Sequence, residues 1–229
     1  MAIPYREAAE QPTRRQAYLD ELLRAHPRQA IDRIIYDRKH DAVREYIRKV
    51  LPGHDRKHDR EIYRDVVLHD PKNNAHYMYA FVPGDIVGTK TPAIVVVNSR
   101  AFDRMREKTF QTVLFGHEHQ HAHDFYAGID LPDGTRIDKS NIQSLSDNVY
   151  DILLETRALR AEIREFITRE GTISSMFKDA FSDLRNYTKK IELATPNSQL
   201  EKTVLDAQAA HIRRTLLRYR DYDRNPQKA

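Results

Sequence analysis

The chain has 229 residues, of which 40% are hydrophobic and 31% charged, with a formal net charge of +4 at pH 7 and no cysteine. The lack of cysteine excludes disulfides and thiolate metal sites, so a tightly bound transition metal must use histidine or carboxylate ligands. Acidic and basic residues are interleaved, which argues against a dedicated nucleic-acid surface, although HIRRTLLRYRDYDR at 211–224 is locally basic.

The sequence has no segment that predicts a membrane span or a secretory signal. No run approaches the roughly 18 apolar residues of a membrane helix, and the N-terminus MAIPYREAAEQPTRRQ has no apolar core. We therefore expect a cytoplasmic protein without a membrane partner; export by a route that needs no cleaved signal would leave the same sequence. The length fits one domain, 1–229.

The first 53 residues predict a helical N-terminal section. Residues 13–25 form an amphipathic pattern that is ended by His26-Pro27. A second helical pattern runs over 27–50 and is stopped by LPG at 51–53. The inward positions of the first helix are Tyr18, Leu19, Leu22 and Leu23.

After residue 53 the hydrophobic pattern changes from helical periodicity to β-rich runs bounded by Pro, Gly and Asn. Their linkers are too short for helical crossovers, which predicts a small, mostly antiparallel sheet. The runs lie at 61–70, 74–84 and 92–99. Helical patterns follow at 103–127, 145–170, 173–193 and 199–220, with a loop at 128–141. The expected fold class is therefore α+β.

Four histidines fall within FGHEHQHAHDF, 115–125. His117, Glu118 and His121 form the pattern H-E-x-x-H. Two imidazoles four residues apart on a helix face the same side and can reach one zinc ion. The glutamate next to the first histidine can then take the proton of the metal-bound water. The alternative is a polar helix face with solvated histidines.

A candidate third ligand lies in NVYDILLETRALRAEI, 148–163, an amphipathic helical pattern. Glu155 falls among its leucines, where a carboxylate is costly unless it is paired or binds a metal. The alternative for Glu155 is an ion pair with Arg157, Arg160 or another basic residue. Four further carboxylates compete for the third position: Asp124, Asp130, Asp138 and Asp151.

The order of strand, H-E-x-x-H helix, loop and glutamate helix resembles the gluzincin metallopeptidases and is similar to the compact minigluzincins. The resemblance covers about 60–165 and implies a zincin-like catalytic core between the helical section 1–53 and a helical extension at 172–220. It implies one zinc ion on His117, His121 and Glu155, with Glu118 as general base. It also implies a peptide or protein substrate that pairs with an edge strand at 93–98.

Several supporting roles have more than one candidate. Asp124 or Asp151 could orient a ligand histidine. For His119 and His123 we expect hydrogen-bonded or exposed side chains, with a second metal as the alternative. His54, Asp55 and His58 imitate the motif within a solvated charge run. A donor to the reaction oxyanion could be any of Tyr126, Tyr150, Arg157, Tyr187 and His211.

The function expected from these residues is zinc-dependent hydrolysis of peptide bonds. A first alternative is a zincin-fold module that binds metal for structure or regulation without efficient turnover. A second alternative is a metal-free helical protein that binds nucleic acid or an acidic partner through its arginines, which leaves the H-E-x-x-H pattern unexplained.

Overall fold

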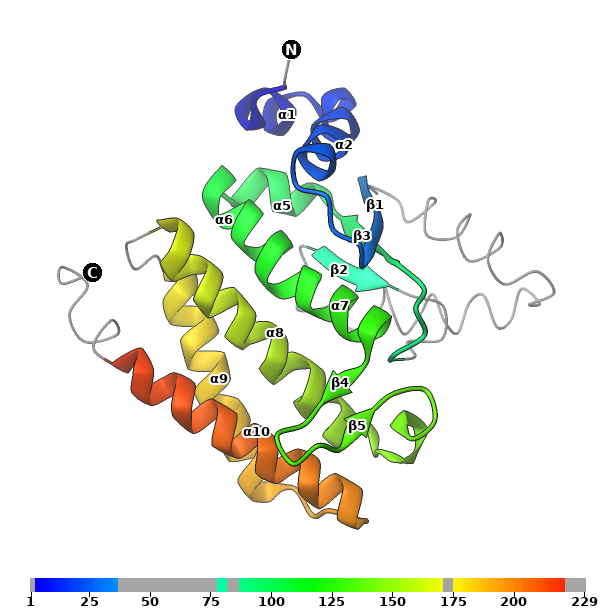
Figure 1. Cartoon of the computed structure of the whole chain (residues 1–229). Helices are drawn as coiled ribbons and strands as arrows, with labels where there is room; N and C mark the ends of the chain where they lie inside the picture. Colours follow the sequence, from blue (N-terminus) through cyan, green and yellow to red (C-terminus); the bar gives the residue numbers. More distant parts are fainter. Residues whose placement is uncertain (1–2, 37–77, 82–86, 171–174, 221–229) are drawn as a thin grey trace.

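The computed structural model describes residues 3–36, 78–81, 87–170 and 175–220 (Figure 1). Over these residues the chain is predominantly helical, with a small three-stranded sheet. The α+β class expected from the sequence is confirmed at this level. In the described part of the chain, no helix is both long enough and apolar enough to cross a bilayer.

The N-terminal section begins with three short helical elements. They are α1 (Tyr5–Glu10), the 3-10 turn η1 (Pro12–Arg14) and α2 (Arg15–Ala25). The expected helix at 13–25 is confirmed in α2, where Tyr18, Leu19 and Leu22 are buried. His26 ends it, as the His-Pro pair predicts.

The predicted helix at 27–50 is wrong where it can be compared. Residues 31–36 form strand β1 (Ile31–Tyr36), which pairs with β3 (Ala93–Val97). The isoleucines at 31, 34 and 35 fit a helical period, but β-branched side chains also favour a strand once a partner strand is present. Residues 37–50 lie outside the described part.

The sheet has the order β1-β3-β2, with β2 spanning Met78–Phe81. β2 and β3 are antiparallel, as expected, whereas β1 and β3 are parallel. All five residues of β3 are buried. The strand at 93–98, expected at the sheet edge, is therefore the central strand, and β2 is at an edge of the described sheet. The predicted strand at 61–70, His54, Asp55 and His58 lie outside the described residues.

The four expected helical stretches after the sheet are confirmed, the first of them in four pieces. After β3 come α5 (Ser99–Arg104), α6 (Glu107–Thr112), the π-helical segment η3 (Val113–Glu118) and α7 (His119–Ala127). The loop contains a small hairpin of β4 (Ile129–Asp130) and β5 (Arg136–Ile137), followed by the turn η4 (Ile142–Ser144). The last three helices are α8 (Asp147–Glu170), α9 (Ser175–Leu193) and α10 (Gln199–Arg218).

Helix α8 is the central element of the helical part (Figure 1). It packs against η3 and α7 on one side and against α9 and α10 on the other. The sheet lies beyond α7, which contacts β2 and β3. Residues of α8 therefore reach two different environments, one shared with the histidine helix and one shared with the C-terminal helix.

Candidate metal centre

The H-E-x-x-H residues lie where the π-helical segment becomes an α-helix. His117 and Glu118 end η3, and His121 lies in the first turn of α7. Glu155 comes from α8, which packs against both elements. Insertions of π-helix occur frequently at functional sites, because the extra residue in the turn changes which side chains share a face.

Three side chains converge as the sequence predicts. The Nε2 atoms of His117 and His121 are 3.2 Å apart. Glu155 places Oε2 at 3.6 Å from the first of these nitrogens and Oε1 at 3.3 Å from the second. Ligands about 2.0–2.2 Å from a tetrahedral zinc ion lie roughly 3.3 Å from one another. The donor set therefore fits one small divalent cation.

The described residues contain one group of three or more histidine, aspartate or glutamate side chains with this property, and it is His117, His121 and Glu155. The rival carboxylates have other partners: Asp124 binds Arg157, Asp130 binds Arg136, and Asp151 binds Lys190. The fourth rival, Asp138, accepts hydrogen bonds from Ser140.

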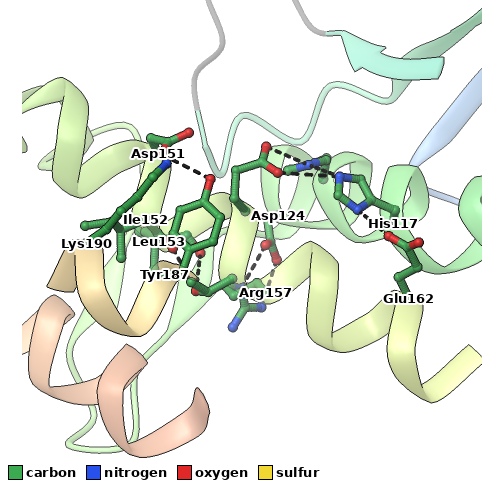
Figure 2. Close-up of polar contacts among 12 residues, drawn as sticks. His117, Asp124, Asp151, Ile152, Leu153, Arg157, Glu162, Tyr187 and Lys190 are labelled. Atoms are coloured by element: carbon green, nitrogen blue, oxygen red, sulfur yellow. Dashed lines mark hydrogen bonds and ion pairs between the residues drawn. The ribbon is translucent and has the colours of Figure 1, made fainter. Parts of the chain in front are cut away.

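His117 is oriented by a glutamate that the sequence analysis missed. Glu162 Oε2 lies 2.8 Å from His117 Nδ1. Figure 2 shows the two side chains pointing toward each other. With Nδ1 donating to Glu162, the Nε2 lone pair of His117 is directed to the other donors. The expected orienting role of Asp124 or Asp151 is wrong for this histidine. A sequence signal existed, since Glu162 lies two helical turns after Glu155 and hence on the same face.

Gly116 allows α8 to approach this closely. A Cβ atom at this position would lie 2.8 Å from the Glu162 Cα and 3.1 Å from the Glu165 Cβ. Any larger residue would therefore push α8 away from η3. The glycine before the motif thus serves the contact between the histidine and its glutamate.

The site has a negative potential that favours a cation. Burial opposes protonation of His117, but the hydrogen bond to Glu162 and the charges of Glu155, Glu162 and Glu118 outweigh it, raising the pKa of His117 to about 10. A proton and a metal ion respond to the same potential. The metal would therefore replace that proton when it binds.

Glu118 is buried, with 4% of its surface exposed. Burial raises the pKa of its carboxyl group and the charge of Glu155 adds to this, while His117, His121 and a hydrogen bond from the Ala80 backbone lower it. The net effect is an increase. A glutamate with a raised pKa is a better proton acceptor near neutral pH than an exposed one.

Asp124 and Arg157 form a buried ion pair that joins α7 to α8 (Figure 2). The Asp124 side chain is fully buried and accepts from Arg157 Nε at 2.7 Å and Nη2 at 2.8 Å. Gln120 donates to the same carboxylate. This fork holds together the helices that carry His121 and Glu155. Arg157 is thus occupied by Asp124 rather than by Glu155.

A cavity of about 470 Å³ lies over the donor set and is lined by His117, Glu118 and Glu155. Tyr187 on α9 is the one lining residue among the five oxyanion donors that the sequence suggested. Its hydroxyl donates to Asp151 Oδ2 at 3.2 Å (Figure 2). Burial raises the pKa of Tyr187, and the charges of Glu155 and Asp151 raise it further, so the hydroxyl keeps its proton.

The other histidine pair of the cluster lies apart from this cavity. The rings of His119 and His123 are 6.4 Å apart, and neither belongs to a three-ligand group within the described part. Burial and the charge of Arg28 lower the pKa of His119 to about 4.

Two imidazole groups and one carboxylate thus converge beside a buried glutamate, and His117, Glu118 and Glu155 line one cavity. No protein-family model, no curated protein and no solved structure matches this chain.

Proposed function

We propose that this protein is a zinc-dependent peptidase of the gluzincin type, with a zincin-like arrangement of its helices around the metal. The observation that supports it best is the spacing of the donors: the side chains of His117, His121 and Glu155, on η3, α7 and α8, bring their nearest ligand atoms within 3.2–3.6 Å of one another. That spacing is what a tetrahedral zinc site with one open position requires. The cavity at this position leaves room for a substrate.

The metal would be held by His117, His121 and Glu155. Zinc bound there would act as a Lewis acid on the scissile carbonyl and lower the pKa of a water molecule. Zinc fits better than calcium or magnesium because two of the three donors are imidazoles, whereas those ions prefer all-oxygen sites.

Glu118 would be the general base. Its carboxyl group lies beside His117 and His121, as their effect on its pKa indicates, and it lines the cavity. Its raised pKa suits a group that takes a proton from water and returns it to the leaving amine.

Tyr187 would donate a hydrogen bond to the oxyanion. It keeps its proton, it lines the cavity, and it belongs to α9, which packs against α8. To reach a substrate it would exchange its bond to Asp151 for one to the substrate oxygen.

The proposal is tested with Glu118→Gln, which is expected to keep zinc while losing about 10²- to 10⁴-fold of its hydrolysis rate. Zinc content is measured by elemental analysis and hydrolysis by mass spectrometry of an unbiased peptide library. Glu107→Gln is the matched control, because Glu107 is exposed and lies on α6, before the motif.

A Glu118→Gln variant that cleaves like the wild type would remove Glu118 from its role. Wild-type protein that contains zinc but cleaves no peptide would favour the metal-binding module without turnover. Wild-type protein with no affinity for zinc would reject both.

A further inference from the structure

The side of α8 that faces α10 carries a second polar cluster, which peptide hydrolysis does not use. Arg160 lies five residues after Glu155, about 140° around the helix axis. Its Nε donates to Thr215 Oγ1 at 3.2 Å, and its Nη1 lies 2.9 Å from His211 Nδ1. Arg160 is half-buried, and these two contacts with α10 hold its guanidinium group in place.

These contacts leave the Arg160 and His211 side chains with hydrogen-bond donors only. A guanidinium group cannot accept a hydrogen bond, so Nδ1 of His211 must be the acceptor and Nε2 must carry the proton. Arg160 retains further N–H groups beyond its two contacts. The pair therefore presents several fixed donors and no acceptor.

Among the described residues, the charges that act on this pair are also of one sign. Burial lowers the pKa of Arg160 to about 10, and Arg164, Arg157 and Arg214 add to the effect. Burial likewise lowers the pKa of His211 to about 4, with Arg160, Arg214 and Arg157 contributing. Of these arginines, Arg157 is neutralised by Asp124. Within the described residues, no carboxylate contributes to either shift.

The sequence of α10 extends this excess of positive charge. From 207 to 220 the chain contains one histidine, four arginines and no acidic residue. Arg164 and Arg214 are exposed next to the fixed pair, one on each helix. Charges of like sign held close together destabilise a fold unless a counter-ion binds among them.

We propose that Arg160, Arg164, His211 and Arg214 form a binding site for the phosphate group of an anionic ligand. We call this set the α8–α10 basic cluster. A phosphate group suits it better than a single carboxylate does, because phosphate carries more charge and offers several acceptor oxygens to forked guanidinium groups. A free phosphate compound and a nucleic-acid backbone share this chemistry. The site is separate from the metal centre and does not depend on peptidase activity.

The test measures binding of a short fluorescein-labelled single-stranded oligonucleotide by anisotropy, and of inorganic phosphate by calorimetry. We expect the wild type to bind at least one of these probes with an affinity that falls as salt increases. Arg214→Gln and Arg160→Gln should each weaken binding about tenfold, the effect of one charge-assisted hydrogen bond.

Arg213→Gln is the matched control, because Arg213 is an exposed neighbour on the same helix and is not among the charges that act on Arg160 or His211. It should change the affinity by less than about twofold. Arg214 is exposed, so its variant tests the cluster even where Arg160→Gln lowers stability.

Oligonucleotide binding that phosphate displaces would assign the site to a nucleic-acid backbone, and phosphate binding alone would assign it to a small phosphate compound. The proposal is overturned if neither probe binds, or if Arg213→Gln and Arg214→Gln lose affinity equally. It is also overturned if a polyglutamate peptide binds more tightly than both phosphate probes.

Discussion

The two sides of α8 carry an excess of charge of opposite sign. Toward η3 and α7, Glu155 and Glu162 meet imidazoles, and the excess charge is negative. Toward α10, the charges of Arg164 and Arg214 act on Arg160, and the excess is positive. In our two proposals, each side binds an ion of the opposite sign. One amphipathic helix can therefore serve two ligand sites, because residues about half a turn apart point to different neighbours.

A third contact of α8 is complete within the chain. Asp124 and Arg157 satisfy each other with two short hydrogen bonds and need no ligand. The Asp124–Arg157 charges thus hold the fold together, whereas the charges on the other two sides of α8 are available to a ligand. This difference predicts that substitutions at the metal face change ligand affinity, whereas substitutions at the closed pair change stability.

The largest expected effect is at the third ligand. Glu155→Ala should weaken zinc binding about a thousandfold, because it removes one of three ligands from a site whose total binding free energy is about 10–16 kcal/mol in known zinc domains. Competition with a chelator of known affinity measures it. Glu165→Ala, on the same helix but paired with Arg169, is the control. Wild-type affinity in Glu155→Ala would place the third ligand elsewhere.

The next effect concerns stability. Asp124→Asn should lower the free energy of unfolding by about 3 kcal/mol, because it leaves the Arg157 charge buried without its partner. Urea denaturation measures the loss. Asp130→Asn breaks an ion pair whose aspartate side chain is 75% exposed, and should cost under about 1 kcal/mol. Equal losses in the two variants would contradict a structural role for the buried pair.

The same pair predicts the acid dependence of stability. Burial would raise the pKa of Asp124, but hydrogen bonds from Arg157, His123 and Gln120 lower it below its ordinary value of 3.8. A carboxylate with a lowered pKa stabilises the fold above that ordinary value, and the contribution is lost as the pH falls through the folded-state pKa. The melting temperature of Asp124→Asn should therefore change less on acidification below pH 3.8 than that of the wild type.

The smallest of these effects is at the orienting glutamate. Glu162→Gln should weaken zinc binding about 10- to 100-fold, because the amide no longer fixes His117 with a charged acceptor. The melting temperature of the metal-free protein should change little by comparison. Glu165→Gln, one helical turn further along, should leave zinc affinity unchanged. If both variants bind zinc equally well, Glu162 has no part in orienting the ligand.

Much of the candidate site follows from local sequence. His117 and His121 share a face because of helical periodicity, and Glu118 lies beside them for the same reason. These relations hold on any helix, whatever packs against it. The spacing of Glu162 from Glu155 carried the same kind of information, since two turns return a side chain to one face. Periodicity does not show which part of the chain packs against this face.

By itself the sequence determined the periodic features of this protein: the helices from about residue 103 onward, a strand at 93–97 and the paired imidazoles at 117 and 121. Only the tertiary structure decided that 31–36 is a strand, that Glu162 rather than Asp124 binds His117, and that Arg160 meets His211. The physical reason is how far apart in the sequence the interacting residues lie. Periodicity is fixed by neighbours within one or two turns, whereas contacts across 45 or 51 residues depend on how whole helices pack.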